Sequence, residues 1–442
     1  MYSSTIGTVL CLSAVGGLSC MNRKNILRDP MVWKFRLYGF FKNLRFFEPF
    51  LVVYLIGLGL SLFHVGVLYS VRESMTYLAE VPSGLLADYW GRKRILLICF
   101  VLYVLSFCGL ALGKGIGTFG VAMVFFGLGD ALRSGVHKAM IYVYLEQRGW
   151  FDEKTFVYGR TRAWSLLGSA LSSFLAVPLA LGLPGYRWLF FLSALPSLGD
   201  VFLVWTYPDW LDGDPQSDRS DHDSGFTAFS FKTIRSVLGD RRLCRTLLSS
   251  SIYDGLFKIV KDYVQPMLSL LIVGNLSGNG DKTLALWLGG VYGSLFLAGS
   301  LASASVWRLR RHLSSSWLMN ISFDAMGGAA LILAGASLWG TPLIVSLIFV
   351  CLYVMKDARK PIFVDLCGDL MDRNVRATVL SVDSQLRALV AVVGAPLLGW
   401  IADGTALTLP FALVGFFMLA VNRWLSVDVR DIVPLDDNKS EN

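Results

Sequence analysis

The chain has 442 residues, of which 54% are hydrophobic and only 16% are charged, and its mean hydropathy is +0.56. Soluble globular chains are about 45–50% apolar and about 25% charged, so this composition excludes an ordinary water-soluble domain and indicates a membrane protein. The net charge of +8 does not call for a nucleic-acid partner, because cations concentrated in short loops set membrane topology and face the anionic inner leaflet.

Residues 1–30 precede the first strong apolar segment. They contain an apolar stretch without the positively charged start that a signal peptide needs, and then the basic sequence MNRKNILRDP from Met21. We predict a cytoplasmic N-terminal segment, with translation beginning at Met21 or with residues 1–20 dispensable.

About twelve apolar segments follow, each long enough to cross roughly 30 Å of hydrocarbon as a helix. They are too long and too continuously apolar to be the strands of a membrane barrel. The predicted fold class is therefore an all-α membrane protein, with a six-helix bundle over residues 31–207 and another over residues 244–426. The predicted spans are 34–56, 63–87, 94–112, 117–144, 161–183, 186–207, 246–272, 284–306, 315–336, 342–366, 377–401 and 406–425.

The one long polar connection is the predicted cytoplasmic linker over residues 208–243. Its first part, DWLDGDPQSDRSDHDSG, has almost nothing to bury and is predicted to be disordered. The sequence FTAFSFKTIRSVLGDRRLCR mixes aromatic and basic residues and predicts a short amphipathic helix on the membrane surface. Residues 427–442 are predicted to be a cytoplasmic tail.

The distribution of cations predicts the orientation in the membrane. Loops on one side carry most of them, including RKR at 92–94 and RR at 241–242, whereas the other side carries little more than Lys114, Arg187 and Lys282. Cytoplasmic loops carry the Lys/Arg excess, so both termini are expected in the cytoplasm and the protein in the plasma (inner) membrane. The seven cysteines are scattered and predict neither a metal site nor a disulfide framework.

The two halves of the chain repeat each other. FKNLRFFEP in the first span resembles FKIVKDYVQP in the seventh, so that Arg45 corresponds to Lys261. GDALRSG in the fourth span corresponds to KDARKP in the tenth, which pairs Asp130 with Asp357. Parallel repeats of this kind are found in membrane transporters, and we predict two halves of common origin.

The segment GLLADYWGRKR, between the second and third spans, resembles the signature loop of the major facilitator superfamily. The resemblance extends over about residues 33–424, although Tyr89 stands where the family more often has a basic residue and the second half lacks the aspartate. The motif is carried by Gly84, Asp88, Gly91, Arg92 and Lys93.

The resemblance implies about twelve transmembrane helices in two pseudo-symmetric six-helix bundles, with helices one, four, seven and ten around a central cavity. It also implies a gating loop that holds the two halves together in one state of an alternating-access cycle. From the residues themselves we expect Gly84 to permit a close helix approach and Asp88 to accept hydrogen bonds or face a helix N-terminus. The alternative is a loop that only anchors the topology.

Charged residues inside the spans are candidate functional groups, because such charges cost several kcal/mol unless they are paired or hydrated. Some have opposite charges at helical spacing and predict local ion pairs, which would be structural: Asp254 with Lys258, Asp130 with Arg133, and Asp383 with Arg387. Arg45, Lys261, Lys356 and Lys360 have no obvious local carboxylate, and this surplus of cations would suit an anionic substrate.

We therefore take a set of charged residues as candidates for the substrate cavity: Arg45, Glu48, Asp130, Arg133, Lys258, Lys261, Lys356 and Lys360. Candidates for proton coupling are Glu48, Glu80, Asp130 and His137, although a histidine of this kind is more often a packed core residue. A structural alternative pairs Arg45 with Glu48, and Lys261 with Asp254 or with a neighbouring helix.

The sequence favours a secondary active transporter that moves a small anionic or zwitterionic solute by alternating access, driven by a proton gradient. The alternatives are a multidrug efflux proton antiporter of the same fold and a non-transporting membrane sensor or scaffold. An enzyme is not expected, because no phosphate-binding loop, metal-ligand cluster or nucleophile elbow is present. No cofactor, metal or catalytic residue is predicted. The expected partners are a small-molecule substrate, an ion gradient and the lipid bilayer, for a monomeric protein.

Overall fold

The computed structural model describes residues 25–212, 241–273, 280–310, 314–339, 341–370 and 376–426. The predicted start at Met21, the greater part of the predicted linker and amphipathic helix, and the predicted tail lie outside these residues. The described residues form helices and no strands, which confirms the all-α fold class.

The first half of the chain contains helices that cover all six of its predicted spans. Their bounds are α2 (Pro30–Phe41), η1 (Glu48–Phe50), α3 (Leu51–Gly57), α4 (Leu62–Trp90), α5 (Arg92–Leu112), α6 (Ile116–Arg133), α7 (Val136–Gln147), η2 (Phe151–Glu153), α8 (Lys154–Gly182), α9 (Arg187–Trp205) and η3 (Asp209–Asp212).

The second half repeats this arrangement with fewer interruptions. Its bounds are α12 (Arg241–Val260), η4 (Lys261–Tyr263), α13 (Val264–Val273), α14 (Gly280–Arg310), α15 (Ser315–Trp339), α16 (Pro342–Leu370), α17 (Arg376–Gly404) and α18 (Thr408–Leu425). Within the described parts of the chain, seven helical stretches are long and apolar enough to cross a membrane.

Three of the predicted spans, 34–56, 117–144 and 246–272, are not uninterrupted α-helices. The first span stops at Phe41 and resumes at Glu48, and the fourth is interrupted at Gly135, which has a φ of 78°. A proline has no N–H to donate to the carbonyl four residues earlier. Pro49 follows the break in the first span, and Pro266 lies just after η4 in the seventh. Both halves therefore have a broken first helix.

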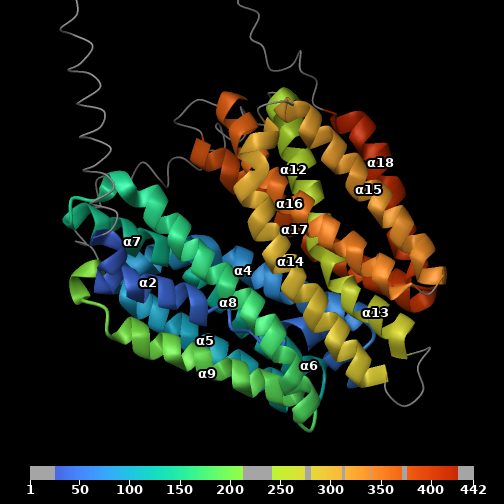
Figure 1. Cartoon of the computed structure of the whole chain (residues 1–442), viewed down its shortest axis with the longest axis horizontal. Coiled ribbons are helices and arrows are strands. Elements are labelled where there is room, and N and C mark those ends of the chain that lie inside the picture. Colours follow the sequence, from blue (N-terminus) through green and yellow to red (C-terminus); the bar gives the residue numbers. More distant parts are fainter. Residues whose placement is uncertain are drawn as a thin grey trace, which may run out of the picture.

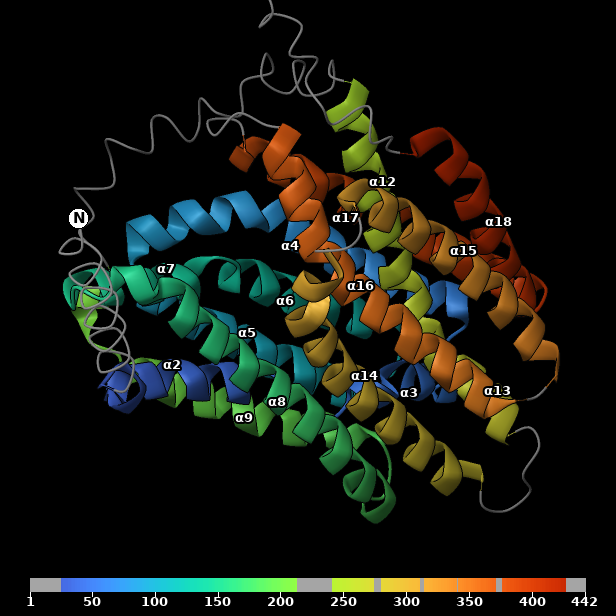
Figure 2. The ribbon, with the colours of Figure 1, turned by 45° about the horizontal axis from the view of Figure 1, so that its top comes forward.

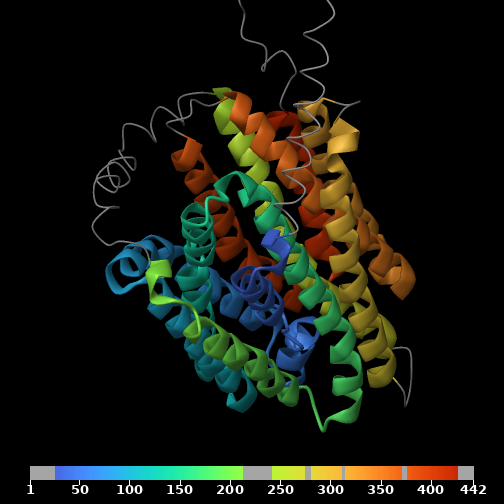
Figure 3. The same cartoon turned by 60° about the vertical axis from the view of Figure 1, so that its left-hand side comes forward.

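Two helix pairs join the halves. α4 packs along α17, and α8 packs along α14 (Figure 1). The second pair is also visible in Figure 3, where α8 runs beside α14. Within the first half, α5 lies between α6 and α9, and within the second half, α15 packs against α16 and α18. Four long helices thus provide the most extensive packing between the halves.

Glycines bring α4 and α17 into backbone contact at one end. A Cβ atom added to Gly66 would lie 2.4 Å from the carbonyl oxygen of Ala395, and one added to Gly399 would lie 2.4 Å from that of Leu62. Any side chain at these positions would therefore collide with backbone atoms that cannot move aside. The contact exists only because both helices present glycine to the other.

A carboxylate of the second half reinforces the same contact. Asp403, in the last turn of α17, accepts hydrogen bonds from the backbone N–H groups of Leu62 (2.9 Å) and Phe63 (2.8 Å). These groups belong to the first turn of α4, where N–H groups have no partner within the helix and where a negative charge is stabilised by the helix dipole. The start of α4 is thus capped by the other half.

From this contact the two helices diverge. Figure 2 shows α4 and α17 moving apart toward the end of α4 at Trp90 and the beginning of α17 at Arg376. The halves are therefore close together near Leu62 and Gly399 and apart at the end that carries the RKR loop at 92–94. This is the asymmetry expected for one end state of an alternating-access protein.

Replacing Gly66 by valine should prevent the halves from closing at the Leu62 end. We expect spin labels at Tyr89 and Trp317, in a variant without the seven native cysteines, to report a shorter main distance. The alternating-access cycle that the sequence resemblance implies includes a conformation in which the diverging ends meet. Gly120→Val is the matched control, since a Cβ at Gly120 has no neighbour within 4 Å. Equal distance distributions for the two variants would contradict this role of Gly66.

Candidate functional site

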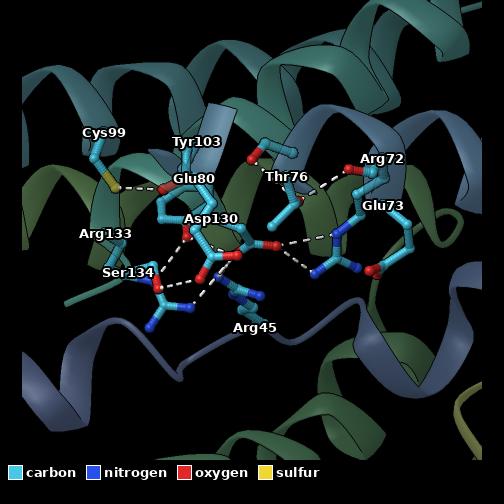
Figure 4. A network of polar contacts seen from close by, with 12 residues as sticks. Arg45, Arg72, Glu73, Thr76, Glu80, Cys99, Tyr103, Asp130, Arg133 and Ser134 are labelled. Atoms are coloured by element: carbon cyan, nitrogen blue, oxygen red, sulfur yellow. Dashed lines mark hydrogen bonds and ion pairs between the residues drawn. The ribbon is translucent and has the colours of Figure 1, made fainter. Parts of the chain in front are cut away.

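A single carboxylate in the first half is surrounded by three arginines. Asp130, in α6, accepts hydrogen bonds at Oδ2 from Nη2 (2.6 Å) and Nε (3.1 Å) of Arg72. Its Oδ1 accepts from the hydroxyl of Tyr103 at 2.7 Å, and lies 3.4 Å from Arg133 and 3.7 Å from Arg45. Figure 4 shows these side chains converging on Asp130. The local pair with Arg133 that the sequence predicted is confirmed.

The position of this cluster follows from the close packing of α4 on α6. A Cβ at Gly127 would lie 2.4 Å from the carbonyl oxygen of Arg72, so glycine is required one turn before Asp130. The hydroxyl of Thr76 donates to both the Arg72 carbonyl (2.9 Å) and the Gly127 carbonyl (3.1 Å). Small and hydroxylated residues therefore set the distance at which the Arg72 side chain reaches Asp130.

An ion pair connects the halves near the same depth. Lys258 of α12 donates a hydrogen bond to the carboxylate of Glu73 in α4. The Glu73 side chain is 11% exposed and the Lys258 side chain 42%, so one side of the pair is open to solvent. The predicted local pair of Lys258 with Asp254 was wrong, because Asp254 instead lies 3.4 Å from Arg387 of α17.

The expectation that Lys261 and Lys356 have no carboxylate close by was also wrong. Lys261 contacts Asp262 at 2.6 Å, and Lys356 contacts Asp357 at 2.9 Å. Asp262 and Asp357 were not considered as partners because adjacent residues do not face each other in a regular α-helix. That rule does not apply to Lys261, which lies in the 3₁₀ turn η4. Among the described residues, the exposed Lys360 forms no ion pair.

Arg387 links two carboxylates in the second half. It contacts Asp383 at 2.7 Å, which confirms the predicted pair four residues apart, and Asp254 at 3.4 Å. The alternative pairing of Lys261 with Asp254 is thus excluded in this conformation, and Arg45 contacts Asp130 rather than Glu48. Asp130, Glu73 and Asp254 are thus each paired with a cation from another helix or segment.

The two broken helices are joined by Gln265. Its side-chain oxygen accepts from the backbone N–H of Val52 (2.7 Å), and its amide donates to the carbonyl of Glu48 (2.9 Å) and contacts the Tyr292 hydroxyl (2.8 Å). A break in a membrane helix leaves backbone groups that need partners. Here one amide side chain of the second half satisfies two such groups of the first.

A cavity of about 250 Å³ lies between the halves at this level. Of the predicted cavity residues, Glu48, Lys258 and Lys261 line it, whereas Arg45, Asp130, Arg133, Lys356 and Lys360 do not. Its charged lining residues are Glu48, Glu73, Asp262, Arg72, Lys258 and Lys261. Three negative and three positive side chains give this lining a formal charge of zero.

Three of these lining residues were not selected from the sequence. Arg72 and Glu73 are adjacent opposite charges inside an apolar helix, and Asp262 follows Lys261 directly. Adjacent residues on a helix point in directions about 100° apart, so the sequence alone did not indicate that all three line one cavity. What the sequence did show is that all three are charged residues within predicted membrane spans.

The signature loop makes its described contacts within the first half. Gly91, which joins α4 to α5, has a φ of 93°. The Lys93 ammonium donates to Asp209 (2.6 Å) and to the Tyr207 carbonyl (2.7 Å), and this hydrogen bond lowers the pKa of Asp209. Arg92 lies 3.7 Å from Asp88.

The expectation that Gly84 sits at a close helix contact was wrong for this conformation. A Cβ at Gly84 would meet no atom of the described residues within 4 Å. The close contacts of α4 lie at Gly66 instead, at the other end of the helix, because the halves are apart where Gly84 is found. The proposed gating role of the loop concerns a state in which these ends approach each other.

The remaining candidates for proton coupling lie away from the cavity. The ring of His137 is buried and stacked on Tyr38 with centroids 3.6 Å apart, and its Nε2 has no hydrogen-bond partner. This geometry favours packing over proton transfer. Glu80 is exposed and accepts a hydrogen bond from Ser134 at 3.3 Å.

Comparison with known proteins identifies related sequences. Residues 37–395 match the family described as the Major Facilitator Superfamily. The uncharacterized MFS-type transporter YxaM of Bacillus subtilis (strain 168) is 20% identical over 386 residues, which cover 84% of this chain and 89% of YxaM. YqjV of the same organism, also an uncharacterized MFS-type transporter, is 29% identical over 101 residues, covering 23% of this chain and 25% of YqjV.

Solved structures share the fold at low sequence identity. The nucleoside transporter NupG has a TM-score of 0.73 and 12% identity, over 90% of this chain and 98% of its own. A D-xylose–proton symporter has a TM-score of 0.65 and 16% identity, over 91% and 96% of the two chains. A POT family transporter in complex with 5-aminolevulinic acid has a TM-score of 0.65 and 14% identity, over 91% and 96%.

Replacing Asp130 by asparagine should destabilise the protein by on the order of 3 kcal/mol, because loss of one partner leaves buried charges uncompensated. The measurement is thermal unfolding of the purified protein in detergent. Asp209→Asn is the matched control: its ion pair with Lys93 is solvent-exposed, and we expect no measurable change. An equal effect of the two substitutions would show that the three arginines do not depend on Asp130.

Proposed function

The chain belongs to the major facilitator superfamily of secondary membrane transporters, and on that premise we propose that it moves a small zwitterionic solute by alternating access, coupled to protons. The choice of a zwitterion rests on one observation. The cavity between the halves is lined by three carboxylates and three cations, so that its formal charge is zero. A solute with one positive and one negative group matches such a lining.

The ion pair between Glu73 and Lys258 distinguishes a zwitterion from an anion. The Glu73 side chain is only 11% exposed, so loss of its cationic partner would leave a largely buried carboxylate uncompensated. An anion that took Lys258 would leave Glu73 in this condition. A zwitterion offers its carboxylate to Lys258 and its ammonium group to Glu73, so it can separate the pair at little electrostatic cost.

The size of the cavity limits the solute. Sites for drug-sized ligands measure about 300–1,000 Å³, whereas this cavity measures about 250 Å³. Amino acids and betaines are small enough to be enclosed. We therefore propose a small metabolite with few non-hydrogen atoms.

The ion pair between Glu73 and Lys258 can also couple solute binding to a movement of the two halves. Glu73 belongs to α4 and Lys258 to α12, and these helices lie in different halves. Separating them weakens a contact between the halves, which is the kind of difference in interaction energy that a ligand needs in order to shift a conformational equilibrium. Transport then requires release of the contacts at Gly66 and Asp403.

We propose that the protein lies in the plasma (inner) membrane. Both of its termini then face the cytoplasm. The RKR loop at 92–94 then faces the cytoplasm, and the diverging ends of α4 and α17 make the present conformation inward-facing. A proton gradient is the proposed energy source, and the protein is proposed to act as a monomer. No enzymatic activity is proposed.

A second candidate function, export of lipophilic compounds, is favoured by a groove between α4 and α17. It measures about 410 Å³ and is largely apolar, with Tyr77, Leu78, Leu386 and Leu389 among its lining residues. A lipophilic substrate would bind here rather than among the charges of the central cavity. The two functions therefore predict different ligands and different sensitive residues.

The proposal predicts that small zwitterions raise the thermal stability of the purified protein, since a ligand of the folded state stabilises it. The panel contains amino acids and betaines, monoanions and monocations of similar size, and lipophilic cations. The best ligand should then accumulate in proteoliposomes when a proton gradient is imposed, and not when the gradient is collapsed. Stabilisation by monoanions alone, or by lipophilic cations alone, would contradict the proposed solute.

Variants test the assigned pair. Glu73→Gln and Lys258→Gln should each weaken zwitterion binding about tenfold or more, equivalent to about 1.4 kcal/mol. The matched controls are Glu146→Gln and Lys282→Gln, which change the same groups at exposed positions and should leave binding unchanged. Full affinity in both Glu73→Gln and Lys258→Gln would place the solute elsewhere.

A further inference from the structure

Asp200 is a fully buried carboxyl group that the transport site does not use. It lies in α9, is 0% exposed, and neither of its oxygens has a hydrogen-bond partner among the described residues. An isolated carboxylate in an apolar interior is unfavourable by many kcal/mol unless it is paired or hydrogen-bonded, and such a group becomes neutral instead. The surroundings of Asp200 in this conformation therefore favour the neutral, protonated carboxylic acid.

Two cations lie within electrostatic range of Asp200 without forming an ion pair with it: Lys42 and Arg133. Arg133 is engaged elsewhere, since it contacts Asp130 at 3.4 Å and donates to the Tyr103 hydroxyl at 2.9 Å. Lys42 forms no ion pair with a described residue, and its ammonium group lies 5.3 Å from the centre of the Tyr38 ring. Lys42 is the cation that remains available to Asp200.

The other polar groups around Asp200 are neutral or already packed. Tyr38 of α2 and Tyr207, which follows α9, lie within electrostatic range, and their buried hydroxyls have no hydrogen-bond partner. His137 of α7 is stacked on Tyr38, and Cys99 and Tyr103 of α5 lie close to Tyr38. None of these groups supplies a positive charge that could replace Lys42.

The backbone around Lys42 is suited to a change of position. Lys42 follows the last residue of α2, and the next helical turn begins only at Glu48. The break is held by side-chain contacts, in which Asn43 donates to the Ser165 carbonyl (2.6 Å) and the backbone N–H of Phe46 donates to the Ser193 hydroxyl (2.9 Å). Movement here does not require a regular helix to be disrupted.

We propose that Asp200 is the proton-binding site of this transporter and that Lys42 is the counter-ion of its deprotonated form. This inference rests on the proposed proton coupling and names the group that performs it. In the protonated state Asp200 is neutral and Lys42 lies on Tyr38. When the proton is released to water, the carboxylate attracts the Lys42 ammonium group, and the proton that later restores the acid also comes from water.

The break in the first span connects this site to the cavity. The segment from Lys42 to Glu48 is seven residues long and also contains Arg45. No helical turn begins in it before Glu48. Arg45 contacts Asp130, and Glu48 lines the cavity. A movement of Lys42 toward Asp200 therefore displaces a segment that carries Glu48 of the cavity and Arg45, a partner of Asp130, which couples protonation to the solute.

The test is infrared spectroscopy of the purified protein in lipid, without any transported solute. A protonated carboxylic acid has a C=O stretching band that its carboxylate lacks. We expect such a band, shifted by 13C labelling of aspartate, that is present at low pH, is lost as the pH rises, and is missing in Asp200→Asn. Asp324→Asn, which alters a carboxyl of α15 in the other half, is the matched control and should retain the band.

The counter-ion is tested with Lys42→Met. Without the ammonium group, Asp200 should keep its proton to a pH about one unit higher or more. An aspartic acid band that Asp200→Asn does not remove, or that disappears at the same pH in Lys42→Met as in the wild type, would overturn the proposal. Should Asp200→Asn fail to fold, the isotope-labelled band and its response to Lys42→Met decide the question.

These outcomes are distinguishable from a failure of the proposed function. Proton binding is measured without solute and without a gradient, so it does not depend on the identity of the substrate. Proton-driven uptake of a zwitterion together with no titrating band at Asp200 would reject Asp200 alone. A titrating Asp200 in a protein that binds no zwitterion would reject the proposed solute alone.

Discussion

The cost of placing charge in an apolar interior is the constraint on which the rest of this structure depends. A charged group in a membrane span must find an opposite charge, a hydrogen bond or water. Several of the central charges here find a partner on another helix, as Asp130 does with Arg72 and Glu73 does with Lys258. These groups line the cavity and supply an ion pair between the halves.

One helix, α4, takes part in the contact between the halves, in the lining of the cavity and in the signature loop. Its first turn is capped by Asp403, Gly66 forms the backbone contact with α17, and Arg72 and Glu73 line the cavity. Its last turn leads into the signature loop. Because contacts between the halves, ligand contacts and the loop share one rigid element, a change at any of them changes the position of the others.

The sequence predicted the features that depend on local pattern, and it missed those that depend on tertiary packing. Apolar length predicted the helices, and helical spacing predicted the pair of Asp383 with Arg387. The same rule wrongly paired Asp254 with Lys258, because spacing permits a contact without excluding a better partner on another helix. Asp200 was overlooked since it has no charged neighbour in sequence, although that isolation in an apolar span was itself the signal.

The central claim is that a zwitterionic solute replaces the ion pair that joins the halves. The most direct measurement is the distance between the Glu73 carboxylate and the Lys258 ammonium group in an experimental structure of the complex with a zwitterion that stabilises the protein. We predict that the two groups are separated, with the solute's ammonium on Glu73 and its carboxylate on Lys258. An intact pair, with the solute bound elsewhere, would contradict it.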